Sequence, residues 1–452
     1  MIKLKTVLGR YHCQVVQAII LAVIFLKVYY IFHFTSYLFS VNFDMASYWH
    51  GAFERAWGDK FSFNQFGLCP AFPIYLFAYF LQLMNGLGIL NDSLQLMIFL
   101  NVLLHGISSY IVYLIVYRLT VRKAIAFGAL IVYLFSYTQL YMNALILPDN
   151  WGTPFLIIVI WIIGFCELNI FSIIGAGLLL GVAISAKPSF IILSTVFVWW
   201  VYSTNVKENK LLRAFLLSIS ILLVPVMTVL ENYHISQGKV ASLSATGGVN
   251  FFQGWAKVSN VSSESSGSGW LYSPGARDEL YWKPFNTQEP WYNQGYFYKQ
   301  GLEYIYQHPL VLLEKITWFK NLFFGFFAPT LSEQPEGYYQ IMPVAQWILY
   351  IMFLSLWILC FLDFRWACDK TIYFLFSILG IFLLTIYLCG MPERRYLSYC
   401  EFLIVILFFV ALDKIISLFK VYQKEIILYF CFVFSFFFLA TLTYKKWIGL
   451  FG

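Results

Sequence analysis

Long apolar runs separated by short polar stretches recur along almost the whole of this chain. The first extends from about Val15 to Phe39 and the last from about Ile426 to Thr443. A helix of about 20 apolar residues crosses the hydrocarbon core of a bilayer, where its backbone groups are satisfied within the helix itself. The pattern therefore predicts an all-α polytopic membrane protein.

Composition excludes two other classes of protein. Hydrophobic residues make up 61% of the 452 residues and charged residues only 11%, with a mean hydropathy of +0.73. So much apolar surface excludes a soluble domain. The net charge of +7 does not indicate a nucleic-acid partner, because Lys and Arg lie in short clusters between the apolar runs, as orientation signals do. The eight cysteines are scattered without metal-site spacing, so they are interpreted as core residues.

The basic clusters predict the orientation of the chain in the membrane. Lys3, Lys5 and Arg10 precede the first apolar run, so the N-terminus is expected inside and the stretch after Phe39 outside. No cleavage site follows the basic start, so the first run is expected to stay as a helix. Later clusters give about 11 spans with the C-terminus outside. Segment 74–84 is placed as a juxtamembrane helix at the outer surface, with a full crossing as the alternative.

Three regions follow from this topology. Residues 1–230 form an N-terminal transmembrane module that includes a first external loop, 40–92. Residues 231–343 are rich in Gly, Ser, Asn, Gln, Trp and Tyr and form a large extracytoplasmic region. Within it, the stretch from Tyr304 to Phe327 is predicted to be an interfacial amphipathic helix. Residues 344–452 form the C-terminal transmembrane helices.

Acidic and basic side chains stand at the ends of several predicted spans. Asp44 follows the first apolar run, and Asp149 follows Pro148 at the next outer exit. Arg394 and Arg395 precede a late run on the same predicted side. Because charge is costly inside a bilayer, ionisable residues kept near it need a partner or a function. These helix ends are therefore the first candidates for a site.

Lys187 lies between two shorter apolar segments, 170–186 and 189–202, and Pro188 follows it directly. Proline cannot continue a helix, because it lacks the backbone N–H and clashes with the preceding turn. The two residues favour a hairpin over a single long span.

The order of four short motifs resembles that of the GT-C fold glycosyltransferases, in particular the branch with protein O-mannosyltransferases and lipid A aminoarabinose transferases. The motifs are Asp44 after the first helix, Pro148-Asp149 at an outer exit, Ser185-Ala186-Lys187-Pro188 at a helix join and Arg394-Arg395-Tyr396 before a late span. Two external stretches, Gly247–Asn250 and Tyr298–Lys315, are similar to the loop that those enzymes place after their seventh helix. The likeness covers nearly the whole chain.

The resemblance implies a GT-C fold and an inverting sugar transfer on the outer face of a membrane. The donor would be a polyprenyl-phosphate sugar, and the acceptor a glycan, a lipid-linked glycan or a protein. Membrane lipid is then the other expected partner, and the bacterial inner membrane the expected location, with the site on its periplasmic or extracellular face.

The resemblance also gives the candidate residues their roles. Asp44 is the predicted base for the acceptor hydroxyl, and Asp149, the second predicted catalytic acid, would orient a cation or contact the sugar. The donor phosphate leaves as an anion and is stabilised by cations. The predicted phosphate-binding residues are Arg394, Arg395, Lys187 and Lys60. The predicted substrate-binding residues are Tyr48, His50, Tyr396 and Asn250.

The acceptor and the metal requirement stay open at this point. Protein O-mannosyltransferases show two adjacent acids in the first loop, whereas Met45 follows Asp44 here. Aminoarabinose transferases carry a lysine before paired prolines of that loop, and Leu68-Cys69-Pro70 lacks it, so Lys60 or Arg55 would be the substitute. No cofactor is predicted, although Asp44 and Asp149 could share a divalent ion.

Each candidate also has a purely structural interpretation. Asp149 could be a helix N-cap, and Lys187 could extend its ammonium to the membrane surface. The Trp and Tyr side chains could form interfacial belts rather than stack on sugars. Two other functional classes remain as alternatives: an O-antigen polymerase or ligase, and a polytopic transporter or flippase.

Overall fold

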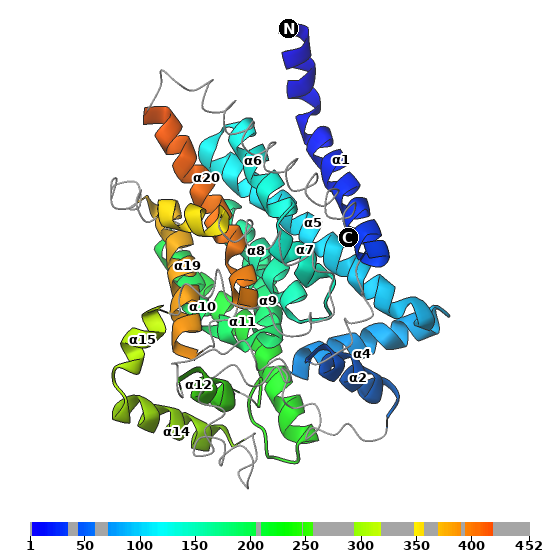
Figure 1. Ribbon diagram of the computed structural model, residues 1–452, viewed down its shortest axis with the longest axis vertical. Helices are drawn as coiled ribbons and strands as arrows, with labels where there is room; N and C mark the ends of the chain where they lie inside the picture. The colour runs from blue at the N-terminus through cyan, green and yellow to red at the C-terminus, as the bar shows by residue number, and fades with distance from the viewer. Residues whose placement is uncertain are drawn as a thin grey trace, which may run out of the picture.

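The computed structural model consists of α-helices and short 3-10 helices, and the residues that it describes contain no strand (Figure 1). These residues are 2–34, 44–58, 71–204, 209–245, 247–255, 293–317, 348–356, 369–389 and 394–418. The predicted all-α class is therefore confirmed for this part of the chain.

Four of the described helices are long and apolar enough to cross a membrane. They are α1 (Ile2–Phe34), α5 (Ser93–Thr120), α11 (Lys210–Ile235) and α19 (Lys370–Cys389). Their apolar portions run over Cys13–His33, Leu90–Thr120, Lys210–Ile235 and Lys370–Leu388. These four helices are consistent with a helical membrane protein.

The prediction of about 11 spans is not matched by the described residues, in which four helices are long and apolar enough to cross a membrane. Several of the expected spans are shorter apolar helices: α6 (Lys123–Leu134), α8 (Asp149–Phe165), α9 (Ile170–Ala186) and α10 (Leu193–Ser203). The 12 residues of α6 extend about 18 Å, which is less than the hydrocarbon thickness of about 30 Å. Hydropathy locates apolar runs, whereas helix breaks inside a run depend on local backbone geometry. The last predicted span, 426–443, lies outside the described residues.

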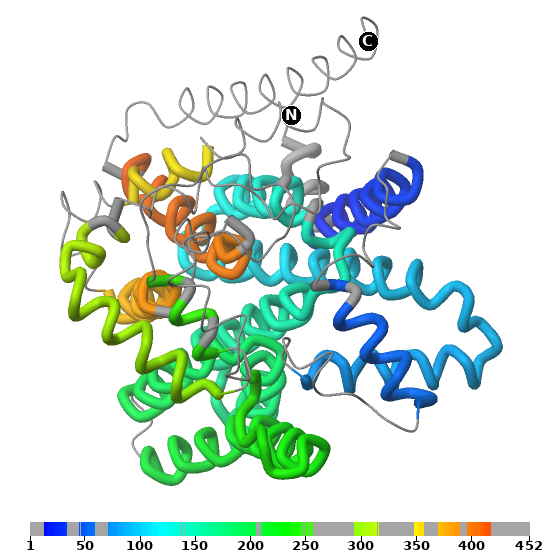
Figure 2. Tube along the Cα trace, turned by 60° about the horizontal axis from the view of Figure 1, so that its bottom comes forward, coloured from blue at the N-terminus to red at the C-terminus, as the bar shows by residue number. Residues whose placement is uncertain are grey.

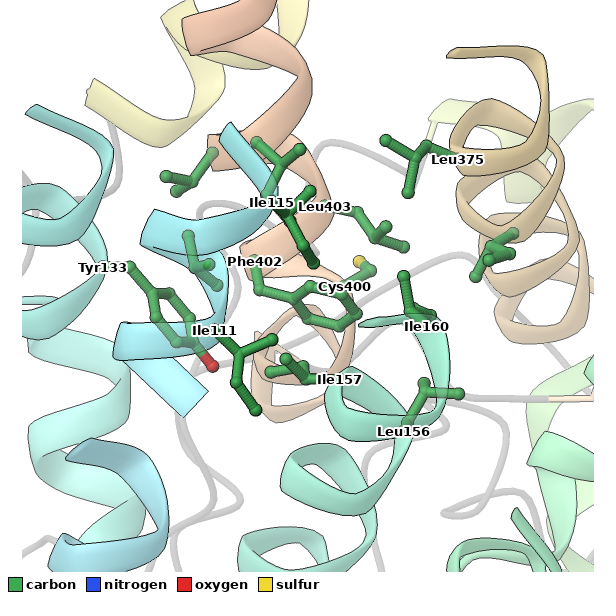
Figure 3. Packing of buried hydrophobic residues seen from close by; sticks show 14 of the residues in the cluster. Ile111, Ile115, Tyr133, Leu156, Ile157, Ile160, Leu375, Cys400, Phe402 and Leu403 are labelled. Atoms are coloured by element: carbon green, nitrogen blue, oxygen red, sulfur yellow. The ribbon is translucent and has the colours of Figure 1, made fainter. Parts of the chain in front are cut away.

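The core lies between α5, α8, α19 and α20 (Glu401–Leu418), with α6 and α9 packed around it. Figure 3 shows side chains from these helices directed toward one another at its centre. They include Ile111 and Ile115 of α5, Leu156, Ile157 and Ile160 of α8, Leu375 of α19, and Phe402 and Leu403 of α20.

Two glycines let α9 and α11 approach closely. A Cβ atom added at Gly177 would lie 2.5 Å from the Cβ of Ser220, and one at Gly181 would lie 2.6 Å from the backbone oxygen of Ile221. Small residues four apart bring helix backbones together where lipid supplies no hydrophobic force between helices. This pair therefore sets the position of α9, which carries Lys187 at its end.

The predicted break at Lys187 is confirmed, but a hairpin in which α9 packs against α10 is not shown, because α9 packs mainly against α8 and α11. Helix α9 ends at Ala186, and the short 3-10 helix η3 (Pro188–Ile192) leads into α10. Lys187 itself is extended, with φ −135° and ψ 92°, as expected for a residue before proline. The side chain of Lys187 therefore projects from the break between α9 and η3.

Helices α2 (Asp44–Trp57) and α4 (Ala71–Gly86) pack side by side at one edge of the bundle (Figures 1 and 2). Segment 74–84 is thus helical, and the 16 residues of α4 are fewer than the roughly 20 that a span needs. Arg55 forms an ion pair with Glu231 at 2.6 Å, and the Tyr75 hydroxyl donates to Asn232 Oδ1 at 2.9 Å. Both contacts join the pair to the last turns of the span α11.

Burial, together with the nearby Glu231, raises the pKa of the Tyr75 phenol well above its ordinary value. Tyr75 therefore stays protonated and remains a hydrogen-bond donor to Asn232 at any physiological pH. This contact fixes α4 to the end of α11 independently of pH.

A second group of short helices lies on the opposite side of the bundle from α2 and α4 (Figures 1 and 2). It consists of α12 (Gly247–Trp255), α14 (Gln294–Gln307) and α15 (Val311–Thr317). The prediction of one continuous amphipathic helix from Tyr304 is wrong, because Pro309 lies in a break between α14 and α15. Residues 318–327 of that prediction lie outside the described residues.

Candidate functional site

Three side chains from distant parts of the sequence meet in one cluster. The Lys187 ammonium lies 3.3 Å from Asp149 Oδ1 and donates a hydrogen bond to the Tyr399 hydroxyl at 2.7 Å. The Tyr399 hydroxyl in turn donates to the same Asp149 oxygen. We call these three residues the lysine cluster. It joins the start of α8, the break after α9 and the end of the 3-10 helix η7 (Arg394–Tyr399).

Asp149 is placed by the proline before it. Pro148 is the N-cap of α8 and has φ −60°, which is already helical, so Asp149 is the first residue of the helix. The structural interpretation of Asp149 as the N-cap is therefore wrong. Its carboxylate still lies at the positive end of the helix dipole, which stabilises its charge. The side chain of Asp149 is only 5% exposed.

Lys187 is also held by two aromatic rings. Its ammonium lies 4.9 Å from the ring centre of Tyr396 and 4.6 Å from that of Tyr399. A cation over an aromatic face is attracted by the electrons of the ring, and more strongly where water is excluded. One fifth of the Lys187 side chain is exposed. Lys187 is therefore a fixed cation on a side chain that is mostly buried.

The predicted arginine pair lies in the same element as two partners of Lys187. Arg394 and Arg395 begin η7, Tyr396 follows them, and Tyr399 ends it. At about 2 Å of rise per residue, the backbone of Arg395 lies roughly 8 Å along the 3-10 helix from that of Tyr399. The side chains of both arginines lie outside the described part of the structure. The structure thus places their backbone, and not their guanidinium groups, next to the lysine cluster.

The first-loop residues pack close to the chain that leads into α8. Asp44 begins α2, and its side chain lies outside the described part. Tyr48 is buried in an apolar cluster that also contains Met45 and the segment 145–147, which directly precedes Pro148. Helix α2 and the entry to α8 therefore share one core, and Tyr48 contributes to it.

The remaining predicted residues do not join the lysine cluster in the described structure. His50 is exposed on α2. Asn250 is exposed on α12, a helix that packs against α14 and α19. Lys60 lies outside the described residues. Of the sequence candidates, Asp149, Lys187 and Tyr396 are brought together, and Tyr399 is the added member.

A second polar cluster, which the sequence did not suggest, adjoins the first. Ser136 donates to Glu401 Oε1 at 2.5 Å, and the Gln139 amide donates to Glu401 Oε2 at 3.2 Å and to the Ser398 carbonyl at 3.1 Å. Gln139 belongs to α7 (Tyr137–Asn143). We call Ser136, Gln139 and Glu401 the glutamate cluster. It fixes α7 to the junction of η7 and α20, so the chain entering α8 and the chain carrying Tyr399 are held together.

A buried lysine and histidine connect α1 to α5. The Lys27 ammonium lies 3.0 Å from His105 Nδ1, and both side chains are buried. The signal for this contact in the sequence was a lysine inside the first apolar run, where an ionisable residue needs a partner.

In the described residues, no group of three His, Cys, Asp or Glu side chains is arranged to hold a metal ion. This result does not cover a metal site that includes Asp44, because the side chain of Asp44 lies outside the described part of the structure. Comparison of the sequence with protein-family models gives no match. Comparison with curated proteins gives no match either. The site's chemistry is therefore the basis for a functional conclusion.

Proposed function

We propose that this protein is an inverting glycosyltransferase of the GT-C type. It would transfer a sugar from a polyprenyl-phosphate donor to a glycan or lipid acceptor on the outer face of the membrane. The observation that supports the proposal most is Lys187, a partly exposed cation fixed by Asp149 and Tyr399 beside the element that carries Arg394 and Arg395.

The proposed role of the cations follows from the leaving group. A polyprenyl phosphate departs as an anion, so its departure requires positive charge more than a proton donor. Lys187 would bind one phosphate oxygen as a point charge, and the adjacent arginines would bind others through paired N–H groups. A membrane-embedded donor brings its phosphate to the membrane surface, where a site at helix ends can reach it.

Asp149 is proposed to be a positioning residue rather than a base. Its carboxylate forms an ion pair with Lys187 and accepts a hydrogen bond from Tyr399, so its charge holds the cation in place. Holding an ammonium in place before the donor binds removes the cost of ordering a flexible lysine chain. Asp44 remains the proposed base for the acceptor hydroxyl, because it begins a helix that shares a core with the entry to α8.

The test is transfer by the purified full-length protein in lipid nanodiscs. A radiolabelled polyprenyl-phosphate hexose is supplied with lipid-linked and free glycan acceptors, and labelled product is measured over time. The proposal predicts release of polyprenyl phosphate and inversion at the anomeric carbon of the product. Absence of transfer from every polyprenyl-phosphate sugar and acceptor supplied would overturn it.

The Asp44→Asn substitution tests the proposed base separately from the residues that bind the donor. The substitution removes a proton acceptor and keeps the size of the side chain, so transfer should be lost while donor binding is nearly unchanged. Glu54→Gln on the same helix is the matched control, and it should leave transfer intact. Turnover of Asp44→Asn at the wild-type rate would exclude Asp44 as the base.

A further inference from the structure

Helix α1 lies at the edge of the bundle, beside α5 and α6 (Figure 1). Its buried side chains lie along one side of the helix and are Val16, Ile20, Val23, Ile24, Lys27 and Ile31. The other side is exposed, and Phe25 there is 67% exposed. Hydrophobic force does not drive helices together in lipid, because the acyl chains are as apolar as the side chains. The position of α1 therefore depends on close packing and on polar contacts.

Close packing and a polar contact occur side by side on α1. A Cβ atom added at Gly106 of α5 would lie 2.5 Å from Ile24 Cδ1, so the two helices approach closely there. Three residues after Ile24, the Lys27 side chain contacts His105 at 3.0 Å, and His105 directly precedes Gly106. These two contacts fix α1 at one level of α5.

Lys27 brings a charge into the bundle that His105 does not neutralise. It is the only Lys, Arg, Asp or Glu in the apolar portion of α1, Cys13–His33, and it lies about 9 Å along the helix from His33. Lys27 is only 5% exposed. An imidazole carries no negative charge, whereas a buried ammonium requires one nearby. The counter-charge must come from another helix.

A buried carboxylate approaches this pair by way of α6. The ring centres of His105 and Tyr133 are 5.0 Å apart. The Ser136 backbone N–H donates to the Tyr133 carbonyl at 3.1 Å, and the Ser136 hydroxyl donates to Glu401 at 2.5 Å. The charge of Glu401 acts on Lys27, and water screens the attraction only weakly because both residues are buried. Glu401 therefore supplies the negative charge that Lys27 requires.

A second charged contact joins α6 and α20 near their other ends. Arg122 and Asp413 form an ion pair at 3.0 Å, and Asp413 lies about 18 Å along α20 from Glu401. The Arg122 side chain is 35% exposed, so water screens this pair in part. The same two helices thus carry one buried and one exposed charged contact, which provides a matched comparison.

We propose that Lys27 and Glu401 are the counter-charges of one buried network, which also contains His105 and Tyr133, and that this network holds α1 in its position. Loss of one charge would leave the other buried and uncompensated, so α1 would shift and the folded state would lose stability. Loss of both charges removes that penalty. The proposal does not depend on the proposed sugar transfer.

The network connects two parts of the molecule that lie far apart in the sequence. Helix α1 precedes α2, the helix that begins with Asp44, whereas Glu401 comes two residues after Tyr399 of the lysine cluster. The position of α1 determines where the chain enters the first loop. A charge on α20 would therefore control the position of the helix that leads to Asp44.

The test compares Lys27→Met, Glu401→Gln and the double variant of the full-length protein in nanodiscs. Paramagnetic amino acids at Phe25 of α1 and Leu223 of α11, both on exposed sides, report the distance between these helices. Each single variant should broaden the distance distribution and lower the unfolding temperature by about 3 °C or more. The double variant should regain the narrow distribution and most of the lost stability.

The matched control removes the exposed pair between the same two helices. Arg122→Met, Asp413→Asn and their double variant should leave the distance between α1 and α11 unchanged in every form, because neither residue belongs to the network. A change in that distance as large as the one in Lys27→Met would show that any lost contact of α6 and α20 moves α1, and would overturn the proposal.

Two results with the network variants would also overturn it. Losses that add in the double variant would show that the two charges act independently. An unaltered distance in both single variants would show that packing alone holds α1. Where a single variant yields no folded protein, the double variant decides: a folded protein with the wild-type distance supports the network, and an unfolded one contradicts it. None of these measurements involves a sugar donor, so failure of the transfer assay would leave their outcome unaffected.

Discussion

The lysine cluster and the glutamate cluster adjoin each other, but their charged side chains differ in their partners and in their exposure. Tyr399 belongs to the first and Glu401 to the second, and only Cys400 separates them. The lysine cluster pairs opposite charges and leaves its cation partly exposed. In the glutamate cluster the carboxylate is buried and accepts hydrogen bonds from a neutral hydroxyl and a neutral amide.

The difference indicates different tasks for the two clusters. A buried carboxylate that accepts hydrogen bonds from fixed side chains holds backbone segments in place. A partly exposed cation that is fixed in advance by a carboxylate can still bind an anion. We therefore expect substitutions in the lysine cluster to affect transfer, and substitutions in the glutamate cluster to affect stability.

The largest effect is expected from Lys187→Met, which removes the charge and keeps the length of the side chain. Loss of one preorganised group that stabilises an anion lowers turnover by about 10²- to 10³-fold. Initial rates of transfer at saturating donor measure this change. Lys299→Met, which removes an exposed lysine from α14, is the matched control and should keep the wild-type rate.

Asp149→Asn tests whether Asp149 acts through Lys187. On its own, the substitution should lower transfer, because it removes the charge that orients the ammonium. In the Lys187→Met background it should cause little further loss, since the group that it positions is already absent. Losses that multiply in the double variant would show that Asp149 acts on the substrate independently.

The second largest effect is expected from Glu401→Gln, and it should appear in stability. The amide of glutamine can accept from Gln139 and donate to the Ser136 hydroxyl, so the two hydrogen bonds remain but lose the charge that strengthens them. The expected cost is about 1 to 3 kcal/mol of unfolding free energy. Thermal unfolding in nanodiscs, followed together with the transfer rate of the folded fraction, measures it. A normal unfolding temperature with lost transfer would contradict the division between the clusters.

The smallest effect is expected from Tyr399→Phe. The ring that faces Lys187 and packs against Phe190 at 5.8 Å is kept, and only the hydroxyl between Lys187 and Asp149 is removed. Because Asp149 and the Tyr396 ring still hold Lys187, loss of the hydroxyl should cost about 1 kcal/mol, or roughly fivefold in donor affinity. The apparent KM for the donor measures this effect, and a loss as large as that of Lys187→Met would show that Tyr399 has a direct chemical role.

The sequence predicted the parts of the fold that depend on local chemistry. Pro188 after Lys187 is sufficient to end a helix. The exact start of α8 was not predicted, because Pro148 and not Asp149 is its N-cap. Long apolar runs correctly indicated helices, four of which are long and apolar enough to cross a membrane. The number of spans could not be obtained in this way, because the helices that form from runs such as 123–134 are set by breaks and packing rather than by hydropathy.

The individual residues of the candidate site were predictable from the sequence, but the contacts between them were not. Asp149 and Lys187 were each recognisable as ionisable residues at helix ends, whereas their contact depends on the way α8 and α9 pack. Glu401 was not recognised because it heads an apolar run and resembles an ordinary charged helix end. Its partners Ser136 and Gln139 lie far from it in the sequence, and only the fold brings them together.

The central claim is that Lys187 is a fixed cation for the donor phosphate. Equilibrium binding of polyprenyl phosphate to the wild-type protein and to Lys187→Met, both in nanodiscs of neutral lipid, tests it most directly. The account predicts binding at least about tenfold weaker in the variant, because a charge-assisted contact is lost. Equal affinities in the two proteins would contradict it.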